Sequence, residues 1–140
     1  LDRGILNKVI ATALDGMPVS IFGEGDSTRD YIYIDDVIDA FVYAGAHMEK
    51  VNGQHYYLGT GTGHSVKEAF TLAVAQATAA SGRKVDISHV SWPDGLSEIE
   101  RRSFVADIDN LRKATGWCPK GDLAEGIKRT IATFLAGGTA

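Results

Sequence analysis

Apolar residues recur every three or four positions in five stretches of the chain, which is the spacing of an amphipathic helix. Short runs of β-branched and aromatic residues lie between these stretches and are typical of strands. The pattern predicts helices over residues 5–14, 35–48, 65–81, 107–116 and 122–135, and strands over residues 19–22, 30–34, 54–58 and 85–90. Short strands that alternate with helices indicate an α/β fold.

Turn-forming residues sharpen several of these boundaries. Gly16 and Pro18 end the first helix, and Gly82 ends the third. Ser65 and Glu68 have the spacing of a capping box, in which each satisfies a backbone donor at the helix start. We expect Asp35 and Asp107 to cap the helices that follow them.

The size and charge of the chain exclude several classes of function. Its 140 residues are enough for one domain or part of one, with 44% hydrophobic residues and a net charge of −4. No cluster of Lys and Arg marks a nucleic-acid surface, and no apolar run is long enough to cross a membrane. A single cysteine, Cys118, fits a reducing cytoplasm, where we expect it to be a packed or idle thiol. The start on Leu1, without a signal-peptide pattern, suggests a fragment.

A glycine-rich loop invites comparison with dinucleotide-binding loops. Gly59, Gly61 and Gly63 follow a predicted strand and precede a predicted helix, but one residue separates the last two glycines where the fingerprint requires two. The acidic residue expected about 20 positions further on to hold the ribose is also missing. We therefore interpret this loop as a tight turn before a capped helix.

Arg29 is the candidate binding residue with the most distinctive surroundings. It follows the Gly23 and Gly25 turn and precedes the run Asp30-Tyr31-Ile32-Tyr33-Ile34-Asp35-Asp36. An arginine offers a rigid fork of donors that matches a diphosphate. From charge alone, a surface ion pair of Arg29 with Asp26 or Asp30 is the alternative.

Blocks along the whole chain resemble the substrate-side half of the extended short-chain dehydrogenase/reductase family, the NAD-dependent nucleotide-sugar epimerases and dehydratases. The blocks occur in the family's order. They are Gly16-Met17-Pro18-Val19-Ser20-Ile21-Phe22-Gly23, the Arg29 to Asp36 run, Tyr56-Tyr57-Leu58-Gly59-Thr60-Gly61, Gly116-Trp117-Cys118-Pro119-Lys120, and Leu123 to Thr130.

The resemblance implies roles for individual residues. Arg29 matches the arginine that grips the diphosphate of a UDP-, dTDP- or GDP-type sugar. Ser20, Ile21 and Phe22 match the short strand that lines the base pocket, where Phe22 could stack on the base or belong to the core.

Two departures leave sugar specificity open. Tyr57 stands where many relatives have Asn, and the segment from Ser91 to Arg102 replaces an Arg-x-Gly-Asp block. Arg101 or Arg102 could supply the second phosphate contact, and Trp92 or Asp94 could face the ribose or base; a solvated loop is the alternative for each.

The resemblance implies a Rossmann-type half that these residues do not contain. A member would carry a glycine-rich NAD- or NADP-binding loop and a catalytic Tyr-x-x-x-Lys pair, yet no tyrosine here has a lysine four positions later. We therefore expect residues 1–140 to be the C-terminal, nucleotide-sugar-binding portion of a larger enzyme, with no catalytic residue and no bound cofactor of its own. A stand-alone nucleotide- or partner-binding module without enzymatic activity is the alternative.

Other candidate chemistry is weak. The four histidines lack metal-ligand spacing, and Asp35, Asp36 and Asp39 are better explained by a helix N-terminus than by a metal. The expected partners are a nucleotide-diphosphate sugar and the missing half, with neither nucleic acid nor membrane. We expect the chain alone to self-associate through surfaces that the missing half would cover, at residues 56–58 or 37–42, or to be only marginally stable.

Overall fold

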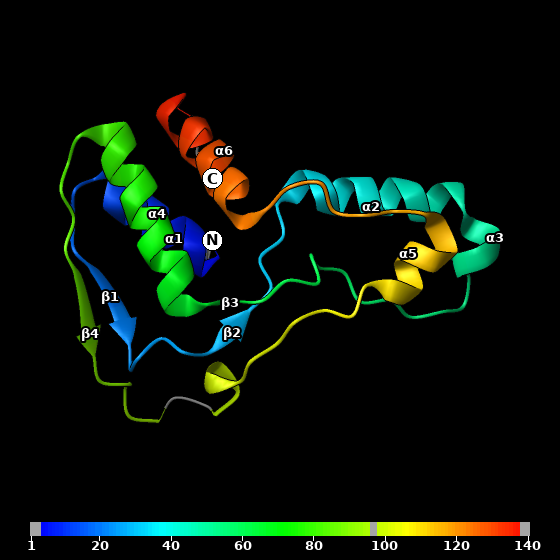
Figure 1. The fold of residues 1–140 in the computed structure, drawn as a ribbon, viewed down its shortest axis with the longest axis horizontal. Helices are drawn as coiled ribbons and strands as arrows, with labels where there is room; N and C mark the ends of the chain where they lie inside the picture. Colours follow the sequence, from blue (N-terminus) through cyan, green and yellow to red (C-terminus); the bar gives the residue numbers. More distant parts are fainter. Residues whose placement is uncertain (1–3, 96–97, 138–140) are drawn as a thin grey trace. The chain divides into compact units, whose positions relative to one another are not determined.

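The computed structural model describes residues 4–95 and 98–137. These residues fold as two compact units, each assembled from segments that are far apart in the sequence (Figure 1). Unit 1 contains residues 4–27, 65–95, 98–102 and 124–137. Unit 2 contains residues 28–64 and 103–123.

Unit 1 is built on a small parallel sheet. Strand β1 (Val19–Phe22) pairs with β4 (Ile87–Val90), in a register that runs from Val19 opposite Ile87 to Phe22 opposite Val90. Helices α1 (Ile5–Leu14) and α4 (Val66–Ser81) pack against each other and against β1 (Figure 1). Because side chains alternate along a strand, Val19 and Ile21 are buried while Ser20 and Phe22 are exposed.

Helix ends in unit 1 follow the sequence prediction closely. The Ser65 hydroxyl accepts a hydrogen bond from the Glu68 N–H at 3.0 Å, which confirms the predicted cap of α4. Gly82 ends α4 in the left-handed conformation, with φ of +73°. The last helix, α6 (Leu123–Leu135), buries Ile127 and Ile131.

Unit 2 has a helical core with short extended segments. It contains α2 (Ile34–Ala46), α3 (Met48–Val51) and α5 (Asp109–Thr115). Strand β2 (Thr28–Arg29) pairs with β3 (His64–Ser65), whose first residue belongs to this unit. Ala40, Leu111 and Trp117 form the centre of the core, against which Ile32, Tyr56, Leu58 and Ile108 pack.

Two predicted strands are wrong. The structure describes all of residues 30–34 and 54–58 and assigns no strand to either segment. A strand needs a partner for its backbone donors and acceptors, and here Ile32, Tyr56 and Leu58 instead pack on the core of unit 2. The alternation of apolar residues in these segments therefore indicated which side chains are buried, but it did not indicate pairing with another strand.

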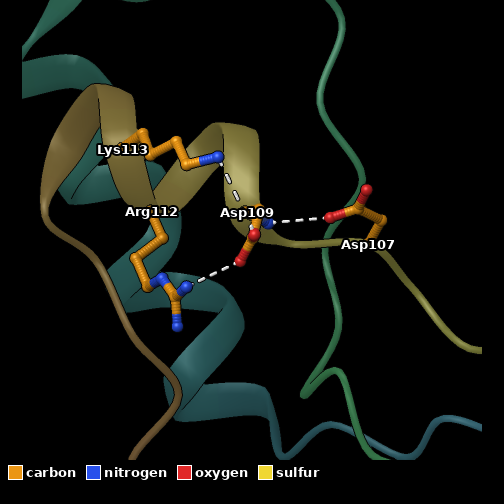
Figure 2. A network of polar contacts seen from close by, with 4 residues as sticks. All are labelled: Asp107, Asp109, Arg112 and Lys113. Atoms are coloured by element: carbon orange, nitrogen blue, oxygen red, sulfur yellow. Dashed lines mark hydrogen bonds and ion pairs between the residues drawn. The ribbon is translucent and has the colours of Figure 1, made fainter.

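Smaller corrections concern the predicted caps and strand length. Helix α2 begins at Ile34 with Tyr33 as its N-cap, so Asp35 lies inside the first turn. Ile108 is the N-cap of α5, and the Asp107 carboxylate accepts a hydrogen bond from the Asp109 N–H at 3.0 Å (Figure 2). Strand β4 is shorter than predicted, and a 3₁₀ turn, η1 (Glu98–Arg101), interrupts the predicted irregular segment 91–102, of which residues 96 and 97 lie outside the described part.

Candidate functional site

Arg29 lies in β2 of unit 2, and hydrogen bonds hold the backbone of Thr28, the residue before it. The Thr28 N–H donates to the Ser103 hydroxyl at 2.9 Å, and the Phe104 N–H donates to the Thr28 carbonyl at 3.0 Å. The half-buried Arg29 side chain donates from Nη1 to the same carbonyl at 3.0 Å. The Thr28 carbonyl thus accepts hydrogen bonds from both the Phe104 N–H and the Arg29 guanidinium, which connects the Arg29 side chain to an anchored part of the backbone.

The Asp30 carboxylate collects hydrogen bonds from two separate segments of unit 2. Its Oδ1 accepts from the Thr60 N–H at 2.8 Å and from the Thr60 hydroxyl at 2.6 Å. Its Oδ2 accepts from the Gly61 N–H at 3.0 Å and from the Ala106 N–H at 3.2 Å. Sequence reasoning considered Asp30 only as an ion-pair partner of Arg29 and missed this role.

This arrangement also explains the glycine-rich loop. A Cβ atom at Gly59 would lie 2.4 Å from Asp30 Oδ2 and 2.6 Å from the Ala106 Cβ, so only glycine allows this approach. The N–H groups of Thr60 and Gly61 point to the protein's own carboxylate. The loop therefore does not fit a dinucleotide pyrophosphate, in agreement with its interpretation as a tight turn.

Tyr31, the residue after Asp30, has a buried hydroxyl group. Among the described residues, the Tyr31 hydroxyl has no hydrogen-bond partner. Burial raises the pKa of Tyr31 above its ordinary value of 10.0, and the positive charge of Arg29 partly offsets this rise. Tyr31 therefore stays protonated at neutral pH.

Unit 1 holds the three strand residues that the sequence proposed for the base. Ser20 is exposed, with its hydroxyl 3.4 Å from that of Ser88. Ile21 is only 1% exposed, so its side chain belongs to the core and only its backbone remains for a ligand. Phe22 is 43% exposed and stacks on Trp92, with ring centroids 5.6 Å apart.

Gly23 permits the close approach of Trp92. It has φ of +61°, and a Cβ there would lie 2.5 Å from the indole Nε1. The Arg101 guanidinium lies over the Trp92 ring, 5.3 Å from its centroid, in cation–π geometry. Phe22, Trp92 and Arg101 thus form one aromatic–cation cluster in unit 1, whereas Arg102 is exposed and Arg29 belongs to unit 2.

Two of the aspartates that the sequence analysis placed at the start of α2 bind other residues of unit 2. Asp36 is 5% exposed and accepts the N–H groups of Lys120 and Gly121, each at 3.1 Å. Asp39 pairs with the Lys120 ammonium, which raises the lysine's pKa. Within residues 4–95 and 98–137, no cluster of His, Cys, Asp and Glu could hold a metal, and no helix is long and apolar enough to span a membrane. Cys118 is exposed.

Comparison with known proteins identifies relatives. The model of the NAD-dependent epimerase/dehydratase family matches residues 1–59. A UDP-glucose 4-epimerase of Mycolicibacterium smegmatis is 35% identical over 95% of this chain and 39% of its own length. A dTDP-glucose 4,6-dehydratase of Salmonella typhimurium is 30% identical over 94% of this chain and 36% of its own length.

A solved structure shows the same similarity. The UDP-glucose 4-epimerase of Thermotoga maritima, determined with UDP-glucose, superposes with a TM-score of 0.81 and 30% identity, over 98% of this chain and 41% of that one. The fold and the sequence therefore agree, over a part of each relative. The chain is similar to the NAD-dependent epimerase/dehydratase family over residues 1–59 and to these relatives over almost all of its own length, and it spans about two fifths of the length of the relatives it matches.

Proposed function

We propose that this chain is the C-terminal, nucleotide-sugar-binding portion of an NAD-dependent nucleotide-sugar epimerase or dehydratase, and that Arg29 binds the ligand's diphosphate. The observation that carries the proposal is the anchoring of Arg29 inside the sequence block that it shares with the family. Thr28 is hydrogen-bonded on one side of Arg29 and Asp30 on the other. A fixed guanidinium pays little entropy when it binds a diphosphate through its parallel donors.

The chain's contribution to the reaction is binding and orientation. Binding energy from the nucleotide, which does not react, is converted into rate when it aligns the sugar with the catalytic groups. The hydride chemistry would belong to NAD or NADP held by the Rossmann half, and these residues supply no Tyr-x-x-x-Lys pair. Ser20, Phe22, Arg101 and Arg102 remain predicted ligand contacts.

A non-enzymatic binding module is the second candidate. It is favoured by the folding of these residues into compact units with their own buried cores. The coding sequence upstream of Leu1 distinguishes the two. An open frame that continues into a Gly-x-x-Gly-x-x-Gly segment supports the enzyme, and a start codon directly before Leu1 supports the module.

Replacement of Arg29 tests the proposal. In the full-length protein, Arg29→Ala should raise the Michaelis constant for the nucleotide sugar about 10- to 100-fold, because a hydrogen bond between charged groups contributes roughly 1.5–3 kcal/mol. The affinity for NAD should stay the same. Kinetics over a range of UDP- and dTDP-hexose concentrations would measure the change.

Arg112→Ala is the matched control. Arg112 is another arginine of unit 2, and it makes a surface ion pair with Asp109 at 2.7 Å (Figure 2). Its removal should leave the Michaelis constant unchanged. If Arg29→Ala folds normally and also leaves it unchanged, the diphosphate contact is refuted.

A further inference from the structure

The Asp30 carboxylate accepts four hydrogen bonds within unit 2, and Asp30 directly follows the candidate ligand-binding Arg29. One oxygen is held by Thr60 alone, through its backbone and its hydroxyl. The other oxygen joins Gly61 to Ala106, which comes from a distant part of the sequence. The carboxylate therefore connects the segment after β2 to two loops that are far apart in the sequence.

We infer that Asp30 is a positioning residue for Arg29. The Cα atoms of neighbouring residues lie about 3.8 Å apart, so the anchoring of Asp30 restrains the backbone of Arg29 from its C-terminal side. Thr28, hydrogen-bonded to Ser103 and Phe104, restrains it from the N-terminal side. The inference rests on the proposed function of Arg29, and it assigns the glycine-rich loop the task of holding Asp30.

The chemistry of the site requires a carboxylate. All four groups that face Asp30 are donors, and a carboxylate offers only acceptors. Asparagine keeps one acceptor oxygen and places an NH₂ group where two backbone N–H groups point. Asp30→Asn therefore keeps the size of the side chain and replaces an oxygen that accepts two of the four anchoring hydrogen bonds.

A double-mutant cycle tests the coupling. The affinity for UDP and for dTDP would be measured by titration calorimetry on the full-length protein as wild type, Arg29→Ala, Asp30→Asn and the double variant. Asp30→Asn should weaken binding at least about tenfold, because a small misplacement of a fixed binding group has a large effect. In the Arg29→Ala background it should weaken binding no further.

Asp107→Asn is the matched control, because the Asp107 carboxylate lies in the same unit and accepts a backbone N–H from Asp109, in α5, at 3.0 Å (Figure 2). It should bind UDP like the wild type. Should Asp30→Asn fail to fold, Thr60→Val removes the hydroxyl that donates to Asp30 at 2.6 Å, together with that hydroxyl's hydrogen bonds to the Thr62 backbone, and keeps the Thr60 N–H donor. It should give a smaller loss that likewise vanishes in the Arg29→Ala background.

The outcomes distinguish a failure of the proposed function of Arg29 from a failure of the positioning role of Asp30 alone. If Arg29→Ala binds UDP and dTDP like the wild type, the proposed function fails and this inference with it. If Arg29→Ala weakens binding while Asp30→Asn, or Thr60→Val in its place, does not, only the positioning role is overturned. An additive loss in the double variant also overturns it, because a purely structural residue would act independently of Arg29.

Discussion

At the scale of single residues, Arg29, Asp30 and Tyr31 meet three different environments. Asp30 has acceptor sites that are filled by donors from two loops. Arg29 donates to the carbonyl of its neighbour. Tyr31 has a buried hydroxyl that is unpaired among the described residues. Asp30 is thus the anchored residue and Arg29 the proposed ligand contact, while Tyr31 carries a polar group that no described residue satisfies.

Tyr31→Phe should therefore stabilise the 140-residue chain at neutral pH. A buried polar group without a partner costs roughly 1–3 kcal/mol, so its removal should raise the free energy of unfolding by about 1 kcal/mol. Urea denaturation at low protein concentration would measure this. Tyr57→Phe, at a residue that is 66% exposed, is the control and should change nothing. A loss of stability in Tyr31→Phe would show that the hydroxyl has a partner.

The burial of Tyr31 also predicts that the stability of the chain depends on pH in the alkaline range. Because burial raises the pKa of Tyr31 above 10.0, the folded state holds more protons than the unfolded state as the pH rises through 10. The stability of the wild type should therefore fall above that pH, and its slope should be shallower in Tyr31→Phe. Denaturation curves at several pH values would give both slopes, and parallel slopes would contradict the assigned burial effect.

At the scale of elements, the sequence predicted helices better than strands. A helix satisfies its backbone locally, so the apolar spacing and Gly82 were enough to predict α4 and its end. A strand depends on a partner from elsewhere in the chain. β1 was predicted correctly and pairs with β4, whereas residues 30–34 and 54–58 carried the pattern without a ladder.

Helix α2 leaves apolar side chains uncovered in this structure. Ile34, Ile38, Phe41 and Val42 are 58%, 53%, 71% and 63% exposed, and their spacing places them on neighbouring parts of one helix surface. Exposed apolar surfaces of this kind bind partners. The surface fits the proposal that a further part of the protein covers it.

The isolated chain should therefore self-associate. Phe41→Ser should reduce this association without loss of stability, because the removed side chain is largely exposed. Leu135→Ser on α6, at a residue that is 59% exposed, is the control and should leave association unchanged. Light scattering at high micromolar concentration would measure the effect. A clean monomer with a sharp cooperative melt would contradict it and show that the chain closes its own core.

At the scale of the whole molecule, the candidate site was only partly predictable. Arg29 was proposed from its sequence block, because the order of residues around it is distinctive, and its role stays a prediction. The four bonds to Asp30 and the cluster of Phe22, Trp92 and Arg101 join residues far apart in sequence, so local patterns did not reveal them. An aspartate directly after Arg29, together with a Gly-Thr-Gly loop whose backbone N–H groups need acceptors, was the available signal for Asp30.

The central proposal about the whole molecule starts from the share of each relative that this chain spans. The chain spans 39% of the matched Mycolicibacterium smegmatis epimerase and 41% of the matched Thermotoga maritima structure. None of its tyrosines is followed four positions later by a lysine, and the donors of its glycine-rich loop are directed to Asp30. We therefore propose that these residues contribute substrate binding and that the catalytic residues belong to another part of the enzyme.

A turnover assay tests that claim most directly. The purified 140-residue chain and the full-length protein would each be incubated with UDP- and dTDP-hexoses and NAD, and NAD binding would be measured by calorimetry on the same samples. The account predicts epimerase or dehydratase turnover by the full-length protein, and neither turnover nor measurable NAD binding by the chain. Steady turnover by a homogeneous sample of the chain would contradict it.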